Sequence, residues 1–140
     1  MIAMKRIHLS DVVFCIVNGD VEELVFWLRD GGSPEVSIQQ DGRTLLHMAV
    51  ECGNEKAVRV LLEHGADIHR TARCGKNVLY FAAIGMVPRF AHNAQGAERI
   101  FKMFVMERGM AKTPGARHAR RVLKWVLARH DLVRLMEYWQ

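Results

Sequence analysis

A repeat of 33 residues in the middle of the chain limits its possible folds more than any other feature of the sequence. Residues 42–49 read GRTLLHMA, and residues 75–82 read GKNVLYFA. In each copy a glycine permits a turn, and Thr44 or Asn77, two residues later, can cap the N-terminus of a helix. A period of this length is typical of proteins that stack copies of one structural unit. The sequence therefore predicts a stack of similar units.

Each unit is predicted to contain two short helices. In the first clear copy, one helix ends near Gly53, and a second runs through residues 55–64 and stops at Gly65, a residue suited to a left-handed helix end. The second helix has an apolar stripe along one face, formed by Ala57, Val58, Val60, Leu61 and Leu62. Neither helix alone can cover its apolar face, so neighbouring pairs have to pack against each other.

The stretch 41–69 closely resembles the ankyrin repeat. The family pattern T-P-L-H-x-A appears as residues 44–49 with Leu45 in place of the proline, followed by the mid-repeat Gly53 and by G-A-D at residues 65–67. The resemblance implies an all-α solenoid of stacked helix-turn-helix pairs with finger-like turns. It also implies a protein that binds other proteins and needs no cofactor.

The resemblance extends more loosely to most of the chain, and we expect residues 1–140 to form a single ankyrin-repeat domain. The expected units are residues 8–40, 41–73 and 74–111, followed by a degenerate C-terminal capping repeat at 112–140. The third unit is about eleven residues longer than the second. We place its insertion near residues 85–97 and its second helix at residues 100–105.

Cysteine content and charge limit the class of protein. Three cysteines, Cys15, Cys52 and Cys74, are far apart and odd in number, which fits neither a disulfide framework nor a zinc site. We therefore expect the three cysteines to be buried thiols in a cytoplasmic protein. No stretch of the sequence is long and apolar enough to span a membrane. Residues 1–98 have a net charge of −2 and residues 99–140 a net charge of +7.

No residue pattern indicates an enzyme. The sequence lacks a phosphate-binding glycine loop, a nucleophile elbow and an HExxH motif. His47 matches the histidine of the family pattern, which implies a structural bridge between repeats, and Tyr80 stands at the equivalent place in the next copy. Polar residues around His64 and His69 fall at a helix end and turn, so we expect no metal site.

The resemblance implies that the partner binds to the first helices, which form a palm, and to the turns, which form fingers. The palm residues implied by position are Phe14, Val17, Asn18, Met48, Glu51, Cys52, Phe81 and Ile84. The finger residues are Gln40, Arg43, Arg73 and Lys76, and the insertion adds Arg89 and Phe90. We expect Phe14, Met48 and Phe81 to be exposed, unless the insertion folds back and buries them. The insertion itself could contact the partner or cover the end of the palm.

Two functions fit these features. The first is a non-catalytic module that binds and inhibits or neutralises one specific protein with an acidic patch, for example as an immunity protein against a toxin. The second is nucleic-acid binding by a basic helix face formed by Arg117, Arg120, Arg121 and Lys124. A solubilising cap would place the same arginines on its outer face, so the first function is the preferred interpretation.

Overall fold

The computed structural model describes residues 6–87 and 92–106, together with the single residues 121, 124 and 128. In the two continuous ranges it contains six α-helices, one short 3-10 helix and no β-strand. The elements in chain order are α1 (Leu9–Val17), α2 (Glu22–Arg29), α3 (Leu45–Glu51), α4 (Glu55–Glu63), η1 (Arg73–Gly75), α5 (Val78–Met86) and α6 (Ala94–Met106). The prediction of an all-α fold built from helix pairs is confirmed.

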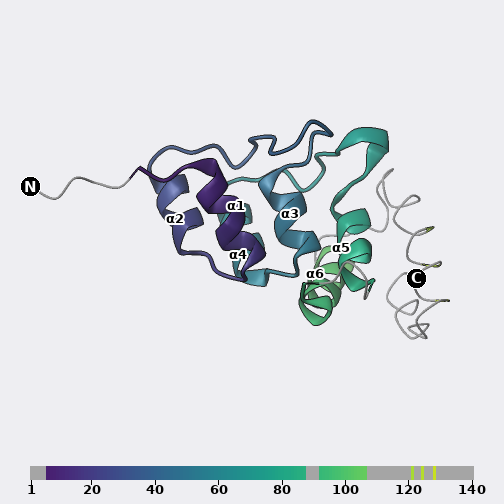
Figure 1. The fold of residues 1–140 in the computed structure, drawn as a ribbon. Helices are drawn as coiled ribbons and strands as arrows, with labels where there is room; N and C mark the ends of the chain where they lie inside the picture. The colour runs from purple at the N-terminus through teal and green to yellow at the C-terminus, as the bar shows by residue number, and fades with distance from the viewer. Residues whose placement is uncertain (1–5, 88–91, 107–120, 122–123, 125–127, 129–140) are drawn as a thin grey trace, which may run out of the picture.

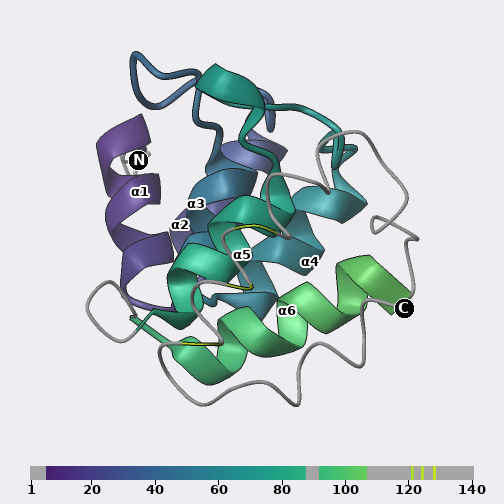
Figure 2. The same ribbon diagram turned by 90° about the vertical axis from the view of Figure 1, so that its right-hand side faces the viewer.

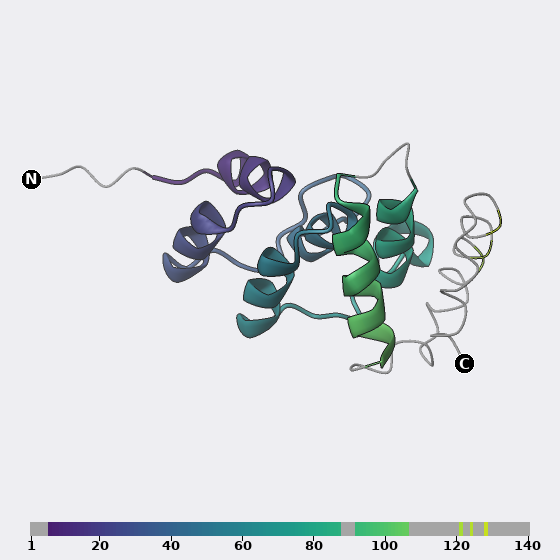
Figure 3. The ribbon, with the colours of Figure 1, turned by 90° about the horizontal axis from the view of Figure 1, so that it is seen from below.

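The helices form two layers. Each odd-numbered helix packs against the even-numbered helix that follows it, and α3 also packs between α1 and α5. The stack therefore runs from the α1–α2 pair at one end to the α5–α6 pair at the other (Figures 1 and 3). The long connections between α2 and α3 and between α4 and α5 lie together along one edge (Figure 1). These connections are the fingers of the repeat pattern.

Side-chain caps begin α3 and α5 where the sequence indicates them. The side chains of Thr44 and Asn77 accept hydrogen bonds from the backbone N–H groups of His47 and Tyr80, respectively. Asn54 caps α4 in the same way, at Ala57. Its amide group also donates to the carbonyl oxygens of Ile16 and Asp20, at 3.1 and 2.9 Å. The cap of one repeat therefore also satisfies free carbonyl groups at the helix end of the preceding repeat.

One apolar core runs through all three helix pairs. The largest fully buried side chains include Leu24 of the first pair, Leu61 of the second and Phe101 of the third. Two of the three cysteines, Cys15 and Cys52, are buried free thiols, as expected. Burial raises the pKa of Cys52 to about 11, so this thiol stays protonated and unreactive at neutral pH.

The third pair corrects the predicted helix boundary. α6 begins at Ala94 instead of near residue 100, and it packs along α5 at that end of the stack (Figure 2). Asn93 takes the role that Asn54 has in the second pair, because it accepts from the N–H of Gly96 and donates to the Gly53 carbonyl. The offset between these two asparagines is 39 residues, six more than the repeat period. The extra length of the third unit is therefore divided between the connection before Asn93 and a longer second helix.

None of the helices in the described residues is long and apolar enough to cross a membrane. Residues 89 and 90 of the predicted insertion lie outside the described part of the chain, as does almost all of the predicted capping repeat.

Candidate functional site

The candidate binding surface consists of the palm and the fingers, which the fold places on α1, α3, α5 and on the two long connections. Phe14 on α1 is 69% exposed, which makes it one of two large apolar side chains that face solvent in the described residues. Asn18 is also exposed, whereas Val17, Met48 and Ile84 are half-buried. Apolar side chains thus recur at related positions along the palm, from the first pair to the third.

The expected exposure of Phe81 is wrong. This side chain is only 1% exposed, because it lies between neighbours from its own repeat and from the preceding repeat. Its ring centroid is 4.9 Å from that of His47 and 5.3 Å from that of Tyr80. Phe81 therefore belongs to the stacking interface, and a partner cannot reach it. Cys52, another residue assigned to the palm, is also buried.

Arg43 connects the first finger to the palm. Its guanidinium carbon lies 4.7 Å from the centroid of the Phe81 ring, within the range of a cation–π contact. The same group pairs with Glu51 at 2.7 Å and with Asp41 at 3.5 Å. Arg43 and Glu51, both assigned from the sequence as binding residues, therefore neutralise each other. Their main effect is to fix the geometry of the surface.

The second finger, between α4 and α5, carries a cluster of positive charges. Residues 70–77 contain Arg70, Arg73 and Lys76 and no acidic residue. Arg73 is exposed, and the ammonium nitrogen of Lys76 lies 5.0 Å from the Tyr80 ring centroid. The backbone N–H of Arg73 also donates to the Asp41 carbonyl at 2.8 Å, which joins the two fingers. Gln40, at the tip of the first finger, is exposed.

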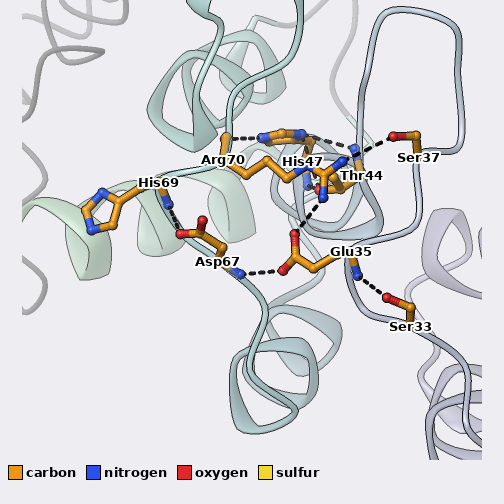
Figure 4. Close-up of polar contacts among 8 residues, drawn as sticks. All are labelled: Ser33, Glu35, Ser37, Thr44, His47, Asp67, His69 and Arg70. Carbon is orange, nitrogen blue, oxygen red and sulfur yellow. Dashed lines mark hydrogen bonds and ion pairs between the residues drawn. The ribbon is translucent and has the colours of Figure 1, made fainter.

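A polar network joins the second finger, which is the connection between α4 and α5, to the connection between α2 and α3 (Figure 4). The Glu35 carboxylate accepts from the backbone N–H of Asp67 at 2.6 Å and pairs with Arg70 at 3.2 Å. Arg70 also reaches the hydroxyl of Ser37 at 3.5 Å. These contacts join residues more than 30 positions apart in the sequence. The sequence alone does not indicate this network, because nothing in the spacing relates Glu35 to the turn of the following repeat.

His47 has a structural role, as the resemblance implies, but both hydrogen-bond partners of its ring lie within the predicted unit 41–73 and do not bridge two units. The Thr44 backbone N–H donates to its Nδ1 at 3.1 Å, so Nε2 has to carry the proton and donate to the Arg70 carbonyl at 2.9 Å. The ring is fully buried. Burial lowers the pKa of His47 below the usual 6.5, and the nearby arginines lower it further. The neutral imidazole is therefore the form that the fold requires.

We expect stability to fall when the pH drops below the ordinary histidine pKa of 6.5. Below that pH, His47 takes up a proton in the unfolded chain but stays neutral in the folded chain. The contribution of neutral His47 to the free energy of unfolding is therefore complete above pH 6.5. It is lost as the pH falls toward the lower pKa that His47 has in the folded state. Urea unfolding of wild type and of His47→Gln, above and below pH 6.5, measures this effect. An equal loss of stability on acidification in both proteins would contradict it.

The remaining predicted sites lie partly outside the described residues. Arg89 and Phe90 cannot be placed, and neither can Arg117 or Arg120. Arg121 and Lys124 are helical and exposed. In the described part of the chain, no group of three or more histidine, cysteine or acidic side chains could hold a metal ion.

The sequence is similar to known proteins over the region that forms this stack. The family model described as ankyrin repeats, in three copies, matches residues 12–104. The human protein phosphatase 1 regulatory subunit 27 is 33% identical over 104 residues, which cover 71% of this chain and 68% of that protein. The Notch-regulated ankyrin repeat-containing protein of Xenopus laevis is 35% identical over 71 residues, or 49% of this chain and 62% of the relative.

A third relative shows how such repeats occur in larger proteins. The mouse 2-5A-dependent ribonuclease is 33% identical over 75 residues, which cover 54% of this chain but only 10% of the ribonuclease. The described helices form three stacked pairs, with glycines at the turns and a continuous apolar core. The chain therefore belongs to the ankyrin-repeat family, whose repeats serve as protein–protein interaction modules.

Proposed function

We propose that this protein binds one specific protein partner through the palm and the fingers, and that it inhibits or neutralises that partner by occupying its surface. The observation that carries the proposal is the exposure of Phe14 beside the half-buried Val17 and Met48. Phe14 and Val17 are not part of the apolar core of the stack, and Met48 packs against that core while it stays partly exposed. Aromatic residues and methionine are enriched at the centres of protein interfaces, so this row supports a binding role.

The charge of the fingers supports a partner with an acidic patch. On the second finger, Arg70 is paired with Glu35, whereas the exposed Arg73 has no acidic neighbour within residues 70–77. Such charges increase the rate of encounter with an acidic surface and disfavour basic ones. The partner surface we propose therefore combines an apolar centre, which faces Phe14 and Met48, with carboxylates that face Arg73 and Lys76.

The names of the relatives support a regulatory role over a catalytic one. One relative is a regulatory subunit of a phosphatase, and another is named as a Notch-regulated ankyrin repeat-containing protein. We infer by analogy that this chain acts on an enzyme or a toxin as a non-catalytic inhibitor, as an immunity protein does. The buried free thiols fit a reducing compartment such as the cytoplasm.

Affinity capture of the tagged protein from its native lysate, with and without nuclease, would identify the partner. The proposal expects one stoichiometric protein that remains bound after nuclease treatment. If every captured protein is lost on nuclease treatment, the interpretation shifts to nucleic-acid binding by the basic residues of the C-terminal third.

The double variant Phe14→Glu/Met48→Glu tests the surface. Each change places a carboxylate on the palm, one at the exposed Phe14 and one at the half-buried Met48, which packs against the core. We expect a loss of affinity of more than about 100-fold. Isothermal titration calorimetry with the captured partner measures the affinity, and circular dichroism monitors the fold. Phe81 is not a suitable target because it is buried.

Phe26→Glu is the matched control, because Phe26 is also a large exposed apolar side chain, 60% exposed, but lies on α2 outside the palm. It should bind the partner like the wild type, and so should Arg120→Ser/Arg121→Ser. Normal affinity of the palm double variant would disprove the assignment of the palm.

A further inference from the structure

The outer face of α2 carries an exposed aromatic ring that the palm does not include. Leu24 and Leu28 point into the core, whereas Phe26 is 60% exposed. A single exposed apolar side chain is ordinary in a folded protein. The setting of Phe26 is less ordinary, because Glu22 stands one helical turn before it and Asp30 one turn after it, and both are exposed. We call this row of three residues the α2 face.

The chemistry of the α2 face suits a lysine or arginine side chain from a partner. A cation over the face of an aromatic ring is attracted by the ring quadrupole, and the two carboxylates would lie on either side of it. Asp30 is the C-cap residue of α2, where the negative end of the helix dipole disfavours a carboxylate. A bound cation would relieve that repulsion. Arg29 is the one positive charge on the exposed part of this helix.

The charge distribution of the chain indicates which partner supplies the cation. Residues 6–40 contain two arginines and six carboxylates, a net charge of −4, whereas residues 107–140, which follow α6, have a net charge of +5. In the basic region Arg121 and Lys124 are exposed and helical, three positions apart. α2 lies at the opposite end of the stack from α6 (Figure 1). One molecule therefore offers an acidic aromatic surface at one end of its stack, and its basic residues follow α6 in the sequence.

We propose that the α2 face binds the basic C-terminal region of a second copy of this chain. The contact is head-to-tail, with different surfaces used by the two copies, so each dimer retains one free α2 face and one free basic region. The attraction depends on exposed charges, and it is therefore strong only at low ionic strength. The α2 face is separate from the palm, so the outcome is independent of the function proposed above.

Sedimentation velocity of the full chain at two salt concentrations tests for self-association. We expect a mass above the 16.0 kDa of one chain at an ionic strength of about 0.01 M, and a monomer at about 1 M. Glu22→Gln should weaken the association several-fold. Glu63→Gln, which removes the same charge from an exposed position on α4, should leave it unchanged. A wild-type protein that stays monomeric at low salt would overturn the proposal.

Mixing two variants tests the head-to-tail geometry. Glu22→Lys/Asp30→Lys blocks the α2 face, and Arg121→Glu/Lys124→Glu blocks the basic region, so each variant alone should be monomeric at low salt. An equimolar mixture should form a dimer and no larger species, because only one contact per pair remains possible. A mixture that remains monomeric, or a variant that dimerises by itself, would contradict the proposed contact. Circular dichroism confirms that both variants are folded.

Discussion

Leu61→Ala is expected to lower the free energy of unfolding by about 2–5 kcal/mol. Leu61 lies on α4 in the middle of the stack, and its side chain is fully buried. Shortening it removes apolar contacts and leaves a cavity that the packed neighbours cannot fill completely. Because α4 contacts both its own partner helix α3 and the next second helix α6, the loss affects two repeats. Urea denaturation monitored by circular dichroism measures the change.

Leu62→Ala provides the matched control for this prediction. Leu62 follows directly on the same helix, but it is only half-buried. The same chemical change should therefore cost clearly less there, because less apolar surface is buried by the native side chain. An equal cost at the two positions would mean that α4 does not face the core as described.

Gly53→Ala is the second substitution with a large expected effect. Gly53 has a backbone φ of +69°, and a Cβ added there would lie 2.2 Å from the Asn93 carbonyl oxygen and 2.9 Å from the Ala97 nitrogen. Both atoms are backbone atoms at the start of α6, so they can move only if the third helix pair shifts. Left-handed strain and the clash together should cost about 2–4 kcal/mol. The measurement is the urea unfolding midpoint.

Gly65→Ala separates the two causes of that loss. Gly65 has a φ of +86°, but a Cβ at this position would meet no atom within 4 Å. The substitution therefore lowers the free energy of unfolding only through the strain of the left-handed conformation, by about 1 kcal/mol. If Gly53→Ala were no more destabilising than Gly65→Ala, the start of α6 would not lie as close to the turn at Gly53 as described.

The sequence predicted most of the fold because ankyrin repeats have local signals at fixed offsets. Thr44, Asn77 and Gly65 act at the positions where the pattern places them, as caps and as a helix end. The start of α6 was missed because no repeat glycine precedes it at the expected spacing. Asn93 could have indicated it, since it is followed three positions later by a small residue, as Asn54 is by Ala57. Only the hydrogen bond from Asn93 to Gly53 makes this correspondence visible.

The candidate site was less predictable than the fold, because exposure depends on neighbours that are distant in the sequence. Phe14, Met48 and Phe81 occupy the same position in successive repeats. The first is exposed, the second half-buried and the third buried. The pattern treats them as equivalent, but Phe81 lies under the guanidinium of Arg43 and against the ring of His47. These contacts come from the preceding repeat, so no local signal reports them.

By itself, the sequence determined the class of fold, the repeat period and the caps at Thr44 and Asn77, because these depend on local signals that recur at a fixed offset. The resemblance added the structural role of His47. The tertiary structure alone decided how much of the palm is accessible. It also decided that Glu35 and Arg70 join two repeats, and that Phe26 stands exposed between two carboxylates. Stacking brings residues more than 30 positions apart into contact. The surface that a partner meets is therefore a property of neighbouring repeats together.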